Sequence, residues 1–469
     1  MERVWTIVLT LLAILVAHCA AIAAFCPPDR DIAPISGDND DSPASFCDCH
    51  MAHTAPWGLP AVTIDCQGRE LLSADLEDLL LPVAAEELTL AWNNLTSAPT
   101  LSANQHLRTL TLAHNAIASV EGAPFARLPN LRLLDLSSND IATLSDDAFE
   151  GLPHLEHLSL ARNRLKGLPS NVFSGLFVLG HLSLSENPLA DFLSQENLFS
   201  YTGITRDLKT LQVAKCNLSK IHLDEDWPVS KLVLSSNLFQ GVPDIPISVR
   251  SLDFGGNLLK RIEPDTFPPL PELEELQLDN MRLLKTVKAD AFLSVSSKLR
   301  RLSLEGCRNL TAFDVFALGN STRDEYPLPL QEVSLRGCRL RKIPAITFSR
   351  AENLTRVQLA GNPLTCDCDV EWIHDLDHDT GAQCGLPVIL RGTLIAELDM
   401  EQFHCDTVKS WFYNILNGLI VFVLLCVCGV AIYFIVMRLK PSRRHAVQKL
   451  AMASPYARVT IQPNRAEHL

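Results

Sequence analysis

One pattern of eleven positions recurs along most of this 469-residue chain and constrains its fold more than any other feature. It reads L-x-x-L-x-L-x-x-N-x-L, where other aliphatic residues also occupy the apolar positions. A clear copy consists of Leu107, Leu110, Leu112, Asn115 and Ile117. Twelve copies follow one another, most often 24 residues apart. Regular repeats of this length indicate one elongated array of stacked units rather than several independent domains.

The central L-x-L of each copy predicts a short strand whose two leucines point to the same side. A single copy cannot bury its leucines alone, so neighbouring copies must stack and share one core. The expected fold class is therefore α/β: a curved, horseshoe-shaped solenoid with a parallel sheet on its concave face. Apolar pairs such as Ala148-Phe149 and Val172-Phe173 are expected to fill the opposite side.

The asparagine of each copy is predicted to be buried at the turn, where its amide bonds backbone groups left open at the strand end. Cys216, Cys307 and Cys338 stand at this position in three copies. A buried cysteine has a weak S–H donor and is a suitable substitute. Cys307 and Cys338 lie in consecutive copies, where parallel side chains favour two buried thiols over a disulfide.

Two apolar segments predict an exported chain that is anchored in a membrane. Residues 1–24 combine Arg3, an apolar run and small residues, as in a secretory signal peptide. Residues 411–437 are long enough to cross a bilayer whose hydrocarbon core is about 30 Å thick. Aromatic residues precede this run and basic residues follow it, which predicts a single-pass type I plasma-membrane protein. Its N-terminus is expected outside the cell, with residues 438–469 as a cytoplasmic tail.

Cysteines gather on both sides of the repeats, which occupy residues 81–361. The N-terminal flank, residues 25–80, contains Cys26, Cys47, Cys49 and Cys66. The C-terminal flank, residues 362–410, contains Cys366, Cys368, Cys384 and Cys405. Behind a signal peptide, an even set of four in each flank predicts disulfides, whereas an oxidising compartment disfavours the alternative of zinc sites. The flanks stand where a solenoid needs caps for its open ends.

The motifs in these flanks carry a resemblance to a known family. Cys47-Asp48-Cys49 and the run from Asn362 to Trp372 resemble the two cysteine-rich flanks of extracellular leucine-rich-repeat proteins. The whole arrangement resembles single-pass transmembrane members of the Capricious and Tartan adhesion type. That resemblance implies disulfides between Cys366 and Cys384 and between Cys368 and Cys405. The long spacer before Cys47 departs from the family pattern, so pairing in the N-terminal flank stays open.

The charge distribution argues against a nucleic-acid partner. The chain carries a net charge of −14, and because the last 32 residues contribute +6, the preceding part carries −20. Phosphate backbones require clustered Lys and Arg, whereas an acidic surface suits extracellular solvent or a basic partner. The sequence contains no recognisable acid–base pair, nucleophile triad, phosphate loop or metal motif, so no enzymatic activity, cofactor or metal is expected.

The side chains that flank the inward leucines are expected to form the ligand-binding surface. In the early repeats, exposed positions are occupied by Trp92, His114, His157 and His181. His157 and His181 are equivalent in adjacent repeats. An ordinary binding surface is favoured over a metal or pH-sensing role, because no third ligand is near, and tryptophan is enriched in interface hot spots.

One column of the later repeats alternates in charge at every step: Glu275, Arg301, Glu332, Arg356. At strand spacing these residues are expected to form a salt-bridge ladder. The ladder has two interpretations, a structural face that satisfies itself or a polar docking patch in which Arg301 and Arg356 bind ligand.

Further motifs concern modification and the tail. Five sequons predict glycosylation at Asn94, Asn217, Asn309, Asn320 and Asn353. In the tail, the segment from Tyr456 to Val459 resembles a tyrosine-based sorting signal, which would bind sorting or adaptor proteins.

These features together predict a cell-surface recognition or adhesion receptor, or a co-receptor, that binds an extracellular or cell-surface protein. Self-binding between copies of the chain is one form of this prediction. Two alternatives remain: a signalling receptor that recruits effectors through Tyr456, and a decoy for a secreted factor. Deleting the tail beyond Lys440 separates them, because only tyrosine signalling requires that segment.

Overall fold

The computed structural model describes residues 47–52, 61–76, 80–319, 327–376, 379–399, 402–403 and 408–439. The predicted signal peptide and the tail motif Tyr456–Val459 lie outside these ranges, as do Cys26, Asn320 and Cys405. The chain divides after Phe403 into two compact units. The first contains the repeats and their flanks, and the second contains one long helix.

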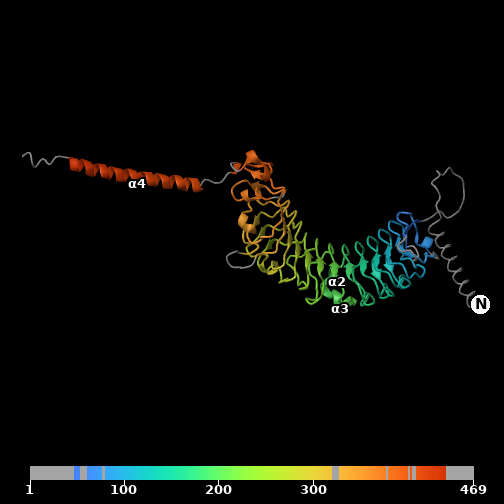
Figure 1. Ribbon diagram of the computed structural model, residues 1–469. Helices are drawn as coiled ribbons and strands as arrows, with labels where there is room; N and C mark the ends of the chain where they lie inside the picture. The colour runs from blue at the N-terminus through green and yellow to red at the C-terminus, as the bar shows by residue number, and fades with distance from the viewer. Residues whose placement is uncertain are drawn as a thin grey trace, which may run out of the picture. The chain divides into compact units, whose positions relative to one another are not determined.

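The repeats wind into a curved solenoid in which each turn adds a short strand to one long sheet on the inner side of the arc (Figure 1). Within the described residues this sheet has 14 strands. In spatial order they are β1 (Asp48–Ala52), β2 (Ala61–Asp65), β3 (Ala85–Thr89), β4 (Thr109–Thr111), β6 (Leu133–Asp135), β8 (His157–Ser159), β9 (His181–Ser183), β10 (Thr210–Gln212), β11 (Lys231–Val233), β12 (Ser251–Asp253), β14 (Glu275–Gln277), β16 (Arg301–Ser303), β18 (Glu332–Ser334) and β19 (Arg356–Gln358).

Neighbouring strands from β2 to β19 pair in parallel, while β1 runs antiparallel to β2. The central residues Leu134, Leu158 and Leu182 align on consecutive strands and are all buried. Strands β3 to β19 correspond to the twelve predicted repeats, so the predicted horseshoe with a parallel concave sheet is confirmed. β2 adds a thirteenth parallel strand from the N-terminal flank, where the leucine pattern is absent.

The remainder of each turn consists of short segments away from the inner sheet. Two-residue strands form two small sheets, β5 (Ser119–Val120) with β7 (Thr143–Leu144), and β13 (Arg261–Ile262) with β15 (Thr286–Val287) and β17 (Ala312–Phe313). Short helices replace them elsewhere: α2 (Ala190–Gln195), α3 (Leu198–Thr202), η1 (Ser73–Leu76), η2 (Leu293–Val295) and η3 (Ala345–Phe348). Figure 1 shows α2 and α3 on the outer side of the arc. Phe149 and Phe173 are buried, with ring centroids 5.8 Å apart, as the apolar pairs in the sequence predict.

The repeated asparagine ties adjacent turns together, as Asn139 illustrates. Its Nδ2 donates to the carbonyl oxygens of Leu112 at 2.9 Å and Leu136 at 3.0 Å, and its Oδ1 accepts the N–H of Ile117 at 3.1 Å. Leu112 and Ile117 belong to the preceding repeat. The predicted role of this residue, bonding backbone groups at the strand end, is therefore confirmed.

Cys216, Cys307 and Cys338 replace the asparagine and are buried free thiols. The Sγ of Cys307 donates to the carbonyl oxygen of Leu278 at 3.2 Å, and the Sγ of Cys338 donates to that of Leu304 at 3.2 Å. Burial raises the pKa of Cys216 to about 11, so this thiol is protonated at neutral pH. The prediction of two buried thiols at Cys307 and Cys338 is confirmed.

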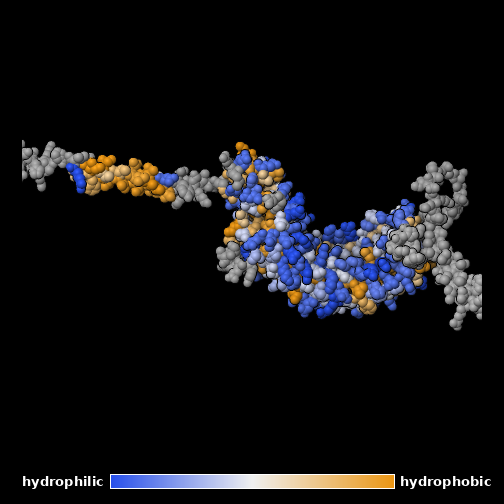
Figure 2. All heavy atoms as spheres, in the orientation of Figure 1, coloured by the Kyte–Doolittle hydropathy of each residue, from blue (hydrophilic) through white to orange (hydrophobic). Residues whose placement is uncertain are grey.

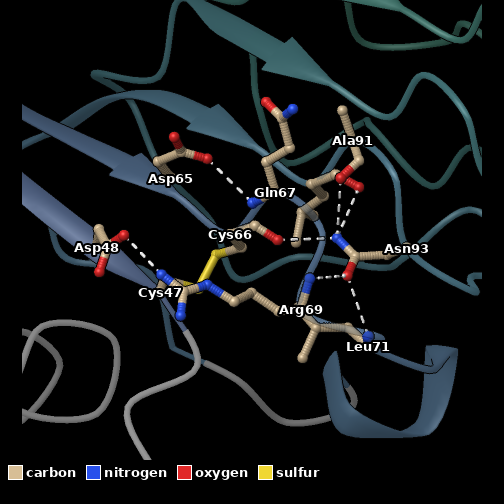
Figure 3. Close-up of a disulfide and its surroundings, with 10 residues drawn as sticks. Cys47, Asp48, Asp65, Cys66, Gln67, Arg69, Leu71, Ala91 and Asn93 are labelled. Atoms are coloured by element: carbon tan, nitrogen blue, oxygen red, sulfur yellow. Dashed lines mark hydrogen bonds and ion pairs between the residues drawn. A yellow bond between two sulfur atoms is a disulfide. The ribbon is translucent and has the colours of Figure 1, made fainter.

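A disulfide between Cys47 and Cys66 closes the N-terminal end of the core, with its Cα atoms 4.2 Å apart (Figure 3). It connects the residue before β1 to the residue after β2. Beside it, the Arg69 guanidinium pairs with the Asp48 carboxylate at 2.5 Å. The Nδ2 of Asn93 donates to the Cys66 carbonyl oxygen at 2.9 Å, so the flank bonds directly to the first repeat asparagine.

The C-terminal flank closes the other end of the core. Cys366 is bonded to Cys384, with Cα atoms 5.6 Å apart, which is the pairing that the family resemblance implied. The flank contains β20 (Leu364–Thr365), β21 (Cys384–Leu386), η4 (Glu371–Ile373), η5 (Val388–Leu390) and η6 (Ile395–Glu397). Cys49 and Cys368 are also disulfide-bonded. The implied partner of Cys368, Cys405, lies outside the described residues, so that pairing stays a prediction.

The second unit is the helix α4 (Val408–Leu439). Its segment Ile415–Ile435 has 21 residues and is long and apolar enough to cross a membrane. Figure 2 shows apolar side chains over the surface of this helix, whereas hydrophilic residues dominate the surface of the repeats. A helix that exposes apolar side chains on all sides is suited to lipid, as the sequence predicts.

Candidate functional site

The concave face of the solenoid presents two side chains from each strand, one on either side of its buried central residue. On β8 these are His157 and Ser159, which flank the buried Leu158. Because neighbouring strands pair in register, equivalent residues form columns that cross the sheet. A ligand inside the arc therefore contacts rows of side chains from consecutive repeats.

The first hollow on this face lies over β6, β8, β9 and β10 and has a volume of about 440 Å³. We call it the histidine hollow; its lining includes His114, Asp135, His157, Arg162 and His181, with Ser159, Ser183 and other hydroxyl side chains between them. Three of the four predicted contact residues of the early repeats thus line one continuous hollow.

His157 and His181 lie opposite each other on neighbouring strands, and their imidazole rings stack. The ring centroids are 4.2 Å apart and the planes differ by 12°. Partial burial lowers the pKa of His181 below the ordinary histidine value of 6.5; His157 and Lys231 act in the same direction, and Glu156 opposes them. His181 is therefore mostly neutral at extracellular pH.

Trp92 does not line the histidine hollow but stacks on His114, which does. Their ring centroids are 3.8 Å apart and nearly parallel, and Trp92 remains 57% exposed. Both residues have left-handed backbone angles, with φ values of 59° and 57°. A bulky residue in this conformation costs about 1 kcal/mol, so the fold holds this aromatic pair in a fixed and strained position.

The left-handed position recurs immediately before the asparagine or cysteine of successive repeats. It is occupied by Trp92, His114, Ser138, Arg162, Glu186, Lys215, Ser236, Gly256, Asn280, Gly306, Gly337 and Gly361. The sequence analysis missed this column, although the glycines at the same position in four repeats are a signal of positive φ. The column forms one margin of the concave face and contributes His114 and Arg162 to the histidine hollow.

The second hollow lies over β14, β16, β18 and β19 and has a volume of about 240 Å³. We call it the charged hollow; it is lined by Glu275, Arg301, Glu305, Glu332 and Arg356 among other residues. It contains both arginines that were predicted to contact ligand. The two hollows thus divide the predicted contact residues between early and late repeats.

The predicted salt-bridge ladder is only partly formed. The register is as expected, since Glu275, Arg301, Glu332 and Arg356 face one another in sequence along the sheet. Arg301 forms an ion pair with Glu275. In the described part of the chain, neither Glu332 nor Arg356 takes part in an ion pair, so a continuous ladder was a wrong prediction. The side chains have enough rotamer freedom to face solvent instead.

A row of carboxylates beside the charged hollow is held by serine hydroxyls rather than by cations. Ser303 Oγ donates to Asp279 Oδ1 at 2.6 Å, and Ser334 Oγ donates to Glu305 Oε1 at 2.6 Å. Burial raises the pKa of Asp279, with Glu305 and Asp253 adding to the rise and the hydrogen bonds from Ser303 and the Glu305 N–H opposing it. The sequence analysis did not predict these bonds, which depend on side-chain placement.

Four of the predicted glycosylation sites, Asn94, Asn217, Asn309 and Asn353, have exposed side chains. Their glycosylation stays a prediction. Among the described residues, no group of three or more His, Cys, Asp and Glu side chains is arranged to hold a metal ion.

Comparison with known proteins places the chain among repeat proteins. A family model described as "Leucine rich repeat" matches residues 85–141 and 130–189. Leucine-rich repeat-containing protein 3 of Danio rerio is 38% identical over 225 residues, which are 45% of this chain and 70% of that protein.

Two further relatives match less of their own length. The Oplophorus-luciferin 2-monooxygenase non-catalytic subunit of Oplophorus gracilirostris is 28% identical over 236 residues, which cover 45% of this chain and 64% of the relative. Leucine-rich repeat transmembrane protein FLRT2 of Rattus norvegicus is 26% identical over 208 residues, covering 38% and 30%. This chain therefore spans less than two thirds of either relative.

A solved structure described as an octameric complex of Latrophilin 3, Unc5D and FLRT2 contains a chain with 23% identity and a TM-score of 0.49. The similarity covers 73% of this chain and 97% of that one. The conclusion about family comes from the Danio rerio relative and from the thirteen parallel strands that repeat the same turn. The chain belongs to the leucine-rich-repeat proteins, with one apolar helix long enough to span a membrane.

Proposed function

We propose that this chain is a cell-surface recognition or adhesion receptor, or a co-receptor, that binds an extracellular protein on its concave face. The observation that carries the proposal is the open sheet surface, in which the histidine hollow and the charged hollow contain five of the six predicted contact residues. Trp92, the sixth, stacks beside the first hollow.

The shape of the face favours a macromolecular ligand over a small molecule. Pockets for small molecules enclose most of the ligand surface, whereas a solenoid arc offers an extended concave surface. Exposed Trp92, Arg301 and Arg356 are of the residue types that contribute most to protein interfaces. The relatives named above include a transmembrane protein with the same repeat, which supports a role at a membrane.

The apolar helix supports anchorage at the cell surface. Basic residues that follow α4 in the sequence favour a cytoplasmic C-terminus, which places the repeats outside the cell. The disulfides at Cys47–Cys66 and Cys366–Cys384 are stable in that oxidising environment. We therefore propose a single-pass plasma-membrane protein with its concave face turned to extracellular partners, including other copies of itself.

Two alternatives use the same ectodomain differently. A signalling receptor would recruit effectors through Tyr456, and a decoy would bind a secreted factor without transmitting anything. A chain deleted beyond Lys440 separates them from each other, since adhesion and decoy binding persist without the tail. Sorting or adaptor proteins that recognise Tyr456 and Val459 would lose their binding site in the same variant.

The experiment displays the full chain on cells and screens it against soluble cell-surface ectodomains, with its own ectodomain among them. The double variant Arg301→Glu and Arg356→Glu should abolish or strongly weaken capture of the partner so identified. Arg127→Glu, which reverses one exposed charge away from the concave strands, serves as control and should leave capture intact. Unchanged capture by the double variant would reject docking at the charged hollow.

A further inference from the structure

We propose that the histidine hollow receives an arginine side chain from the protein partner, with Asp135 as its counter-charge, and that protonation of His157 and His181 releases it. The inference rests on the proposed function, because it specifies the chemistry of a partner on the concave face. It goes beyond that function in naming the kind of side chain that is recognised and the condition under which recognition fails.

The cations around the histidine hollow are already neutralised by the protein itself. Arg132 pairs with Glu156 at 3.0 Å, and Arg162 pairs with Glu186 at 3.2 Å. Lys215 also reaches Glu186, at 3.2 Å. The arginine in the lining, Arg162, is therefore compensated and does not make the hollow a site for anions.

Asp135 is the charge in the lining that lacks such a partner. It lies on β6, half-buried, directly opposite Ser159 of β8. Its Oδ1 accepts the N–H of Ser137 at 2.9 Å, which fixes the orientation of the carboxylate. Within the described residues Asp135 forms no ion pair, so its charge remains available to a ligand.

The surroundings of Asp135 suit a guanidinium group in particular. Arginine offers five planar donors and a long apolar stem. Asp135 can accept two of these donors, and Ser137 and Ser159 in the same lining present further hydroxyl acceptors. Leu133 lies next to them and offers apolar contact to the stem. The net charge of −20 before the tail also favours approach of a basic partner.

The stacked imidazoles make this contact dependent on pH. While neutral, His157 and His181 tolerate a guanidinium nearby and can accept hydrogen bonds from it. Protonation places positive charge on rings stacked at 4.2 Å and beside the bound cation, so the arginine is repelled. The charged groups that face the pair are Asp135 from β6, Arg132 and Glu156 from the segments before β6 and β8, Arg162 and Glu186 from the margin, and Lys209 and Lys231 from the β10 and β11 side.

Lys209 and Lys231 lie outside the lining of the hollow. They add positive charge on the side away from Asp135. Together with the compensated arginines, this distribution leaves the negative end of the hollow at β6 and its titratable rings at β8 and β9. Acidification changes the charge of the rings, so the expected direction is weaker binding of a cation as pH falls.

The test uses the full chain in neutral phosphatidylcholine nanodiscs and a fluorescent peptide, acetyl-Arg-Gly-Arg-Gly-Arg-amide, measured by anisotropy. A citrulline peptide of the same shape but without charge is the ligand control. Asp135→Asn keeps the oxygen that accepts the Ser137 N–H and should weaken arginine-peptide binding about fivefold, the upper range for a partly exposed ion pair. Asp191→Asn, on the outer helix α2, makes the same charge change and should leave binding unchanged.

The pH arm compares pH 7.4 with pH 5.5. The wild type should lose arginine-peptide affinity on acidification, and His157→Gln with His181→Gln should lose much less. Equal effects of Asp135→Asn and Asp191→Asn, or tighter binding at pH 5.5, would overturn the inference. Either result, with partner capture on cells still abolished by the Arg301 and Arg356 charge reversal, would leave the receptor proposal standing. Intact capture by that double variant would instead count against the receptor proposal alone.

Discussion

The imidazole rings of His157 and His181 stack with centroids 4.2 Å apart, although a complete repeat separates the two residues in the sequence. Their contact follows from the parallel pairing of β8 with β9, in which the two histidines face each other directly. The pair occupies the open side of the sheet and lines the histidine hollow. The fold thus converts a 24-residue spacing into a local pair of titratable groups on the proposed docking surface.

Acidification should destabilise the folded protein through His181. Its pKa in the folded chain is lowered from 6.5, mainly by partial burial, so below pH 6.5 the unfolded chain binds protons more readily. The contribution of His181 to folding stability is therefore constant above that pH and falls as the pH drops through the folded pKa. Urea unfolding of wild type and His181→Gln at pH 7.5 and pH 5.0 should show a smaller loss on acidification in the variant.

His154→Gln is the matched control, because His154 is exposed outside the concave strands. It should follow the wild type at both pH values. The same pH dependence in His181→Gln as in wild type would contradict the assignment.

Replacement of a repeat asparagine should loosen the joint between two turns. Asn139→Ala removes the partners of the Leu112 and Leu136 carbonyl oxygens and of the Ile117 N–H. A buried group left unpaired costs about 1–3 kcal/mol, so the midpoint of the first urea transition should fall clearly. Asn139→Cys should lose less, because buried cysteines already donate to the equivalent carbonyls in other repeats.

Asn130→Ala provides the comparison, since exposed Asn130 makes one hydrogen bond, to the Gln105 carbonyl oxygen at 2.7 Å. Its effect on the midpoint should be small. A loss as large as that of Asn139→Ala would show that burial of the repeat asparagine is not the cause.

The three buried thiols should resist alkylation in the native protein. Cys216, Cys307 and Cys338 are buried, and burial raises the pKa of Cys216 to about 11. Iodoacetamide reacts with the exposed thiolate, so at pH 8 little label is expected on these residues. In guanidinium chloride all three should be labelled, which mass spectrometry of tryptic peptides detects. Rapid labelling of Cys307 or Cys338 without denaturant would argue that the late repeats open.

Non-reducing peptide mapping should recover linked fragments that contain Cys47 with Cys66 and Cys366 with Cys384. The family resemblance also predicts a fragment that joins Cys368 to Cys405. Removing a native disulfide from a cap typically costs about 2–5 kcal/mol, so Cys366→Ser with Cys384→Ser should increase proteolysis in the late repeats. Recovery of Cys366 linked to another cysteine would contradict the structure of the C-terminal cap.

Most of the fold could be predicted because the leucine spacing specifies both the strand and its neighbour. Leu134, Leu158 and Leu182 recur at 24 residues, and equal spacing places them side by side in a stacked array. β2 could not be predicted in this way. Its residues Val62 and Ile64 alternate with polar ones, but no leucine repeat surrounds them, and parallel pairing with β3 comes from contact with the core.

The candidate site was predictable in its columns but not in its contacts. Strand alternation placed His157 beside His181 and Arg301 beside Glu332. It could not show that the imidazoles stack or that Arg301 pairs with Glu275 alone, because such contacts depend on rotamers and solvent exposure. The role of Asp135 needed the structure as well, since its significance lies in which neighbouring charges are already paired.

The measurement that tests the central claim most directly places a glycan on the concave face. Arg301→Asn creates the sequon Asn-Leu-Ser on β16, with Ser303 as its hydroxyl residue. Ser200→Asn creates Asn-Tyr-Thr on α3 at the outer side of the arc. With glycan occupancy verified by mass spectrometry, the account predicts that the Arg301 variant loses capture of the extracellular partner while the Ser200 variant retains it. Loss of capture in the Ser200 variant with full capture in the Arg301 variant would contradict docking on the concave face.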